Sequence, residues 1–163
     1  MITEIFESVL DELSINTNLL SQSEIKQIDQ RGFILCKGLL SEEDIISLRK
    51  RFEQLFELEG PAAGVQFHQG SINLNRYGQE PGVRRLCDLV NKGEIFCKIF
   101  LNPKLIATAT HVFQRDFKFS ALNGRDVEQG QGLQKLHSDW RKKYDGNFHV
   151  FNSIWLLFSN ILS

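Results

Sequence analysis

Hydrophobic residues recur at helical spacing in the first two thirds of the chain. The first such run predicts an amphipathic helix and consists of Ile2, Ile5, Phe6, Val9, Leu10 and Leu13. Ser21 and Glu24 have the spacing of a capping box and predict the start of a short second helix. Gly32 follows that helix and is expected to end it in a left-handed conformation.

Three further helices are expected downstream, each with a start signal followed by an apolar face. These are Ser41 followed by Ile45 to Phe56, Pro81 followed by Val83 to Val90, and Asn102-Pro103 followed by Leu105 to Val112. Residues 60–64 contain glycine and proline and are expected to stop the first of them. Residues 65–80 are rich in Gly, Asn and Gln and are expected to form a loop.

Strands are predicted mainly in the last third of the chain. The candidates, which alternate apolar and polar residues or are dense in large apolar ones, are 33–37, 117–123, 133–139 and 148–158. Residues 124–132 are expected to form a loop. A mainly helical segment (1–113) followed by a β segment (117–158) predicts an α+β fold in a single domain, residues 1–163.

Composition and charge exclude several classes of protein. The 163 residues are 42% hydrophobic and 24% charged, which is close to the soluble globular average and argues against general disorder. Nineteen basic and 20 acidic residues give a net charge of −1, whereas a dedicated nucleic-acid binder normally shows a basic excess.

The sequence carries no recognisable signal for secretion or membrane insertion. The most apolar stretch, 151–158, is too short to span a membrane and is interrupted by polar residues. The N-terminus is acidic and lacks the basic region of a secretory signal. Cys36, Cys87 and Cys97 form no CxxC motif and are expected to be free thiols, so a reducing cytoplasm fits best.

The pattern His137-Ser138-Asp139 is the main candidate for chemistry. On a strand, residues two apart point to the same face, so the imidazole and the carboxylate would converge. Together they would be two thirds of the 2-His-1-carboxylate triad that binds Fe(II) in oxygenases. The alternative is a coincidental match, with a surface histidine near a salt-bridging aspartate.

Three segments in order resemble the phytanoyl-CoA dioxygenase family of Fe(II)- and 2-oxoglutarate-dependent oxygenases. They read RGFILCKGLLSEEDIISLRKRFEQL, FKFSALNGRDVEQGQGLQKLHSDW and FNSIWLL. The resemblance covers about residues 22–157 and includes a strand-to-helix element, an LHxD motif and an Asn-x-x-Trp-x-Leu strand.

The resemblance implies a double-stranded β-helix, a jelly-roll barrel, of which this chain would hold the first strands, leaving the barrel incomplete. It implies that His137 and Asp139 are iron ligands and that Asn123 and Arg125 contact 2-oxoglutarate.

Trp140 would line the substrate pocket or pack at the barrel rim. The implied reaction uses dioxygen, placing one oxygen atom in an unactivated C–H bond and the other in succinate as 2-oxoglutarate is oxidised to succinate and CO₂. For Asn123 and Arg125, a strand-end turn with a solvated arginine is the alternative.

The sequence departs from the family after the LHxD motif. The family's third ligand is a later histidine followed by an arginine, but the one histidine after Asp139 is His149, which is better explained as a surface or strand-entry residue. The match ends at Leu157, so we expect a truncated chain that is inactive alone. Unpaired strand edges would then favour self-association.

Other residues that could contact a ligand have simpler explanations. His68 and His111 are expected in a loop and on a helix, and Trp155 in the core. A basic cluster around the motif could attract an anionic small-molecule substrate or form a solvated face, and consists of Lys135, Arg141, Lys142 and Lys143. The competing function is a non-catalytic α+β binding domain in which the His-x-Asp pattern is coincidental.

Overall fold

The structure is a computed structural model that describes residues 2–64, 66–68, 71–73, 82–140 and 143–157. Helices and antiparallel strands are both present, so the chain is α+β as predicted. It folds into two compact units. The first comprises residues 1–41, 98–119 and 138–156, and the second comprises 42–97, 120–137 and 157–163.

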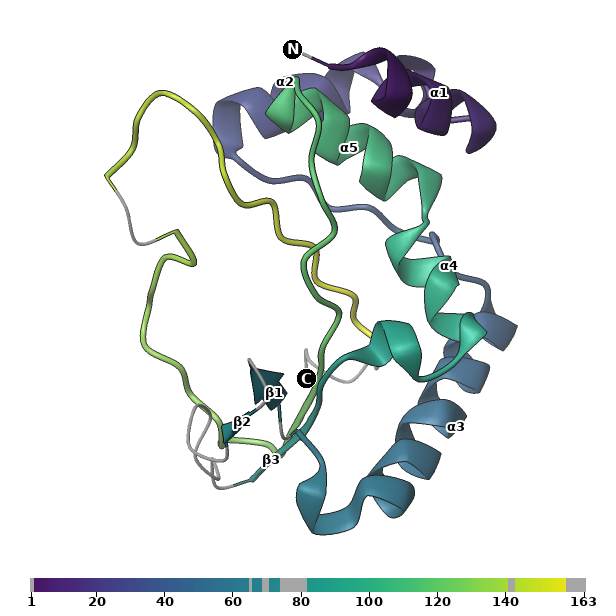
Figure 1. Cartoon of the computed structure of the whole chain (residues 1–163), viewed down its shortest axis with the longest axis vertical. Coiled ribbons are helices and arrows are strands. Elements are labelled where there is room, and N and C mark those ends of the chain that lie inside the picture. Colours follow the sequence, from purple (N-terminus) through teal and green to yellow (C-terminus); the bar gives the residue numbers. More distant parts are fainter. Residues whose placement is uncertain (1, 65, 69–70, 74–81, 141–142, 158–163) are drawn as a thin grey trace. The chain divides into compact units, whose positions relative to one another are not determined.

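The first unit is built on three α-helices, shown in Figure 1: α1 (Glu4–Glu12), α2 (Gln22–Arg31) and α5 (Pro103–Phe113), with a 3-10 turn η1 (Thr17–Leu19). Their ends follow the predicted signals. Ser21 and Glu24 form the capping box of α2, and Gly32 ends it with a φ of 77°, a conformation that glycine adopts without steric cost. Asn102 caps α5 by accepting hydrogen bonds from the backbone of Lys104 and Leu105.

The core of the first unit is small. Ile15, Leu20 and Ala107 are buried, and partly buried apolar residues pack around them: Leu10, Leu19, Ile25, Ile34 and Ile106. Phe6 of α1 packs edge-on against Phe117, with ring centroids 4.9 Å apart. The apolar face of α1 is wider than this core covers, because Ile5 on the same helix is 79% exposed.

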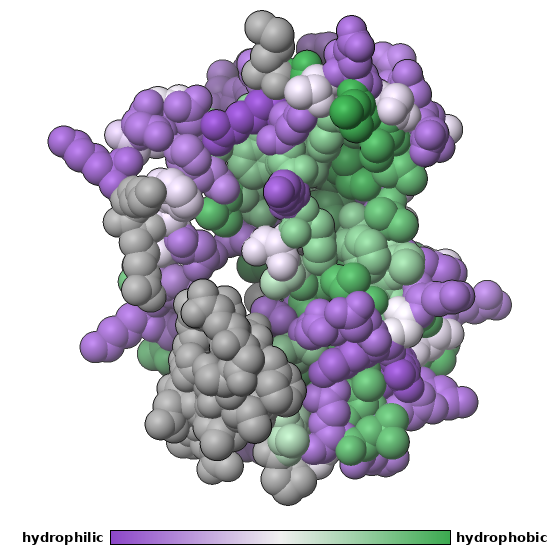
Figure 2. Space-filling view, in the orientation of Figure 1, coloured by the Kyte–Doolittle hydropathy of each residue, from purple (hydrophilic) through white to green (hydrophobic). Residues whose placement is uncertain are grey.

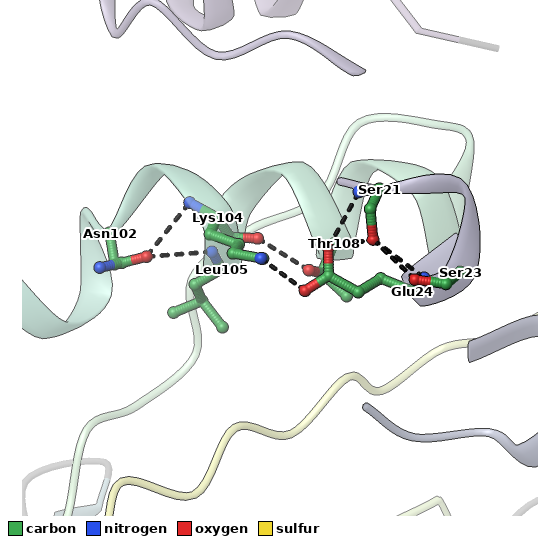
Figure 3. A network of polar contacts seen from close by, with 7 residues as sticks. All are labelled: Ser21, Ser23, Glu24, Asn102, Lys104, Leu105 and Thr108. Carbon is green, nitrogen blue, oxygen red and sulfur yellow. Dashed lines mark hydrogen bonds and ion pairs between the residues drawn. The ribbon is translucent and has the colours of Figure 1, made fainter. Parts of the chain in front are cut away.

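A polar network joins α2 to α5 (Figure 3). The Lys104 ammonium forms an ion pair with Glu24, whose other carboxylate oxygen accepts hydrogen bonds from the backbone N–H and the hydroxyl of Ser21. Thr108 donates its hydroxyl proton to the carbonyl of Lys104. These contacts lower the pKa of Glu24 to about 2, chiefly through the hydrogen bond from Lys104.

The second unit is centred on the long helix α3 (Glu42–Glu59), which packs against strand β3 (Val83–Leu86) and the 3-10 helix η4 (Glu94–Phe96). Its fully buried side chains are Leu48, Leu86, Leu89 and Phe96. Its remaining elements are η2 (Gly60–Ala62), β1 (Gln66–His68), β2 (Ser71–Asn73), η3 (Leu89–Asn91) and β4 (Gly124–Val127). Helix α4 (Cys97–Phe100) begins at the last residue of the 42–97 segment and continues into the first unit.

The sheets are two antiparallel pairs, β1 with β2 and β3 with β4. The second pair sets Val83 opposite Val127 and Leu86 opposite Gly124. Arg84 of β3 bridges Asp126 of β4 and Glu53 of α3. The hydrogen bond from Arg84 is the main reason that the pKa of Glu53 is lowered.

The predicted helix from Pro81 to Val90 is wrong within the described residues. Val83–Leu86 form strand β3, and a 3-10 turn begins at Leu89. Two observations explain the difference. Pairing with β4 satisfies the backbone groups of β3, and Asp88 adopts a left-handed conformation with a φ of 57°, which interrupts any α-helix. Pro81 itself lies outside the described residues.

The strand predictions also need correction. Residues 33–37, 117–123, 133–139 and 148–157 belong to no strand, and residue 158 lies outside the described residues. The strand in this third of the described chain is instead β4, inside the predicted loop 124–132. In the predicted loop 65–80, β1 and β2 are formed, and the other residues lie outside the description. Apolar alternation alone was not sufficient, because a strand also needs a partner for its backbone.

Large apolar side chains therefore reach the surface, and Figure 2 shows such residues among hydrophilic ones on one face. Leu133 is 98% exposed and Ile154 is 86% exposed. Among the described residues, no helix combines the length and the apolar character needed to cross a bilayer.

Candidate functional site

His137 makes a short local hydrogen bond. Its Nδ1 atom lies 2.9 Å from the backbone carbonyl oxygen of Lys135, and the side chain is exposed. A carbonyl oxygen only accepts, so Nδ1 carries the proton of the neutral ring and Nε2 keeps its lone pair. Histidines that bind metals typically have this arrangement, in which one ring nitrogen donates to a carbonyl and the other faces the metal.

Asp139 is held by a residue further along the chain. Asn152 donates a hydrogen bond from Nδ2 to Oδ2 of Asp139. A metal-binding carboxylate is commonly hydrogen-bonded in this way, because the second partner fixes its orientation. His137 belongs to the second unit and Asp139 to the first, and each has its supporting contact within its own unit.

Trp140, the predicted pocket or barrel-rim residue, packs against a histidine. Its ring stacks on the imidazole of His149, with centroids 4.2 Å apart and planes at 11°. The Nε2 atom of His149 lies 2.9 and 3.0 Å from the two carboxylate oxygens of Asp145. Its Nδ1 atom lies 3.3 Å from a guanidinium nitrogen of Arg115. Both ring nitrogens of His149 thus have partners.

Asn123 and Arg125, the residues expected to contact 2-oxoglutarate, make hydrogen bonds to backbone groups of the second unit. The side-chain oxygen of Asn123 accepts a hydrogen bond from the backbone N–H of Asp88. Arg125 lies in β4 and donates a hydrogen bond to the carbonyl of Gly132, so this bond links two residues of the 124–132 segment.

The structure also places the remaining histidine, cysteine and basic candidates that fall within the described residues. His111 pairs with Asp29 at 2.7 Å. His68 lies in β1. Cys36, Cys87 and Cys97 form no disulfide, and the buried Cys87 donates from its thiol to the carbonyl of Gly64. Burial raises the pKa of Cys36. In the basic cluster, Lys135 and Lys143 are exposed, whereas residues 141–142 lie outside the described residues.

Within the described part of the chain, no three His, Cys, Asp or Glu side chains gather closely enough to hold a metal ion. His137 and Asp139 each have the supporting hydrogen bond that a ligand needs, but a third donor is not assembled with them. The described residues therefore do not fit a complete three-ligand iron centre.

Sequence reasoning missed three residues that shape this region. Asn152 was noted only as part of the Asn-x-x-Trp-x-Leu strand, although its amide reaches Asp139. Asp145 could have been found from its spacing of four residues from His149. Its hydrogen bond from His149 is the main reason that the pKa of Asp145 is lowered. Arg115 carried no signal, because its contact spans more than 30 residues of sequence.

Comparisons with known protein families, with curated proteins and with solved structures find no match to this chain.

Proposed function

We propose that this chain is part of a non-heme Fe(II)- and 2-oxoglutarate-dependent oxygenase of the phytanoyl-CoA dioxygenase type. In this proposal His137 and Asp139 are two of the three metal ligands, and the third ligand is not among the 163 residues. The chain is then inactive alone.

The observation that best supports the proposal is the hydrogen bond between His137 Nδ1 and the carbonyl of Lys135. In water, an exposed neutral imidazole has no fixed tautomer, whereas this contact selects the one in which Nε2 can bind a metal. The hydrogen bond from Asn152 to Asp139 gives the second predicted ligand a comparable support.

The histidine content supports the proposal that the third metal ligand is not among these residues. The sequence has four histidines, and two of those outside the motif, His111 and His149, have aspartate partners. With two ligands a metal site loses both a bond and its geometry, so we expect weak binding and no turnover.

The finer fold proposal is that residues 133–139 and 148–157 are the first strands of a double-stranded β-helix. Their apolar side chains support it, because Leu133, Leu136 and Ile154 lie exposed as they would in strands without their neighbours. We propose that these segments enter a sheet when further strands are supplied.

A non-catalytic α+β binding domain is the second candidate, and one observation favours it. The described residues gather no three-donor group. In that case His137 and Asp139 would have no shared role, and substituting either would leave ligand binding elsewhere unchanged.

A succinate assay tests whether this chain alone catalyses the oxidation of 2-oxoglutarate. The purified chain is incubated without oxygen with Fe²⁺ and 2-oxoglutarate, oxygen is admitted, and succinate is measured against the same mixture without protein. We expect no succinate above that control. Succinate formation that disappears in His137→Ala would contradict the proposal that the chain is inactive alone.

A further inference from the structure

His149 connects three parts of the first unit. Its ring stacks on Trp140, its Nε2 atom faces Asp145, and its Nδ1 atom faces Arg115, which lies just after α5. The side chain is only 21% exposed. A second contact reinforces the link, because the same guanidinium nitrogen of Arg115 donates to the carbonyl of Phe148 at 2.7 Å.

The partners determine where the proton of the ring lies. A guanidinium group only donates hydrogen bonds, so Nδ1 of His149 must accept from Arg115. The proton of the neutral ring is then on Nε2, where it is donated to the carboxylate of Asp145. This tautomer is the opposite of the one fixed at His137.

Protonation of His149 would disrupt one side of this arrangement and strengthen the other. An imidazolium has no acceptor at Nδ1, and it would place a second positive charge 3.3 Å from the guanidinium of Arg115. The ion pair with Asp145 and the stacking on Trp140 would both gain from the added charge.

We propose that His149 is a pH-operated latch between the 143–149 loop and Arg115. When the ring is neutral, it joins the loop to the segment after α5. When the ring is protonated, Arg115 is released from both Nδ1 and the Phe148 carbonyl, and the ring keeps its contacts with Asp145, inside the loop, and with Trp140. Within the described residues, the charged side chains that contact His149 are those of Asp145 and Arg115. The latch does not depend on the proposed oxygenase function.

The direct test follows the ring nitrogens of His149 by NMR from pH 8 to pH 5 in the full chain. At pH 8 we expect the Nε2–H tautomer. Arg115→Gln removes the opposing charge and should move the protonation midpoint of His149 to higher pH. Asp145→Asn removes the favourable charge and should move it to lower pH. Lys118→Gln is the matched control, since Lys118 is exposed in the same segment as Arg115. In this variant the protonation midpoint of His149 should stay close to that of the unmodified chain.

A second measurement tests whether the 143–149 loop becomes more mobile when Arg115 is released. Heteronuclear NOE values for residues 143–149 should fall between pH 8 and pH 5 in the unmodified chain and should be low at both pH values in Arg115→Gln. Two results would overturn the proposal. One is the Nδ1–H tautomer of His149 at pH 8, and the other is a protonation midpoint of His149 in Arg115→Gln equal to that in Lys118→Gln. NOE values in the unmodified chain that do not change with pH would also overturn it, a result that needs no variant to fold.

Discussion

The Nδ1 atom of His137 lies 2.9 Å from the carbonyl oxygen of Lys135. The bond spans two residues and forms without a sheet partner, so it does not depend on the strand that the sequence predicted there. It places the proton of the neutral ring on Nδ1, which is the tautomer that our proposal for His137 requires.

This contact predicts the tautomer of His137. Above the pH at which the ring is protonated, a long-range ¹H–¹⁵N correlation spectrum should show the proton on Nδ1 of His137 and on Nε2 of His149. His137→Gln identifies the resonances. A proton on Nε2 of His137 would remove the main support for its role as a ligand.

The ion pair between Glu24 and Lys104 predicts a pH-dependent contribution to stability. The pKa of Glu24 is lowered to about 2 in the folded chain from an ordinary value near 4.5. The stabilisation is therefore complete above pH 4.5 and is lost as the pH falls toward 2. Both side chains are less than a third exposed, so we expect Lys104→Met to lower the free energy of unfolding by about 1 kcal/mol at pH 7.

The measurement is urea unfolding followed by far-UV circular dichroism at several pH values. Lys26→Met is the matched control because Lys26 is an exposed lysine on α2. The difference between the two variants should shrink below pH 4.5. A difference that is constant from pH 7 to pH 3 would contradict the assignment.

The helices could be predicted well because their signals are local. Ser21, Glu24 and Gly32 lie within a dozen residues, and the structure places them as the cap and end of α2. Prediction failed at β3, where Val83 and Leu86 also fit a helical spacing. Their pairing with β4 involves residues about 40 positions away, which a local pattern does not contain.

The candidate site shows the same limit. The sequence identified His137 and Asp139 as a pair of residue types, but the partners that orient them differ in reach. Lys135 is two residues from His137, whereas Asn152 is thirteen residues from Asp139 and its role required the structure. Arg115 and His149 are further apart still and were found only through their contact.

Gly124 fills a position where a side chain has no room. A Cβ atom there would lie 2.3 Å from the ring of Phe52, which packs edge-on against Phe96. Gly124→Ala should therefore destabilise the chain by about 1–3 kcal/mol through overpacking. Adding Phe52→Leu should relieve the clash, so the double variant should lose less stability than the sum of the single variants. Additive losses in urea unfolding would show that the ring does not limit this position.

Exposed apolar residues in the C-terminal third predict concentration-dependent self-association. Ile154 is 86% exposed in a segment that lies outside any sheet among the described residues. Ile154→Lys should reduce the associated fraction in sedimentation velocity. Ser153→Lys adds the same charge at the neighbouring exposed polar position and should have little effect. Equal effects of the two variants would assign the change to charge alone, and a monomer at all concentrations would contradict the prediction.

The central claim, that His137 and Asp139 bind the same metal ion, is tested most directly by paramagnetic broadening. Fe²⁺ is added in small steps without oxygen to ¹⁵N-labelled chain in the presence of 2-oxoglutarate, a method that detects even weak binding. We expect the resonances of residues 137–139 to broaden first. The effect should be lost in His137→Ala and in Asp139→Ala and kept in His111→Ala. Broadening centred elsewhere, or unchanged in His137→Ala, would contradict the claim and favour a coincidental His-x-Asp pattern.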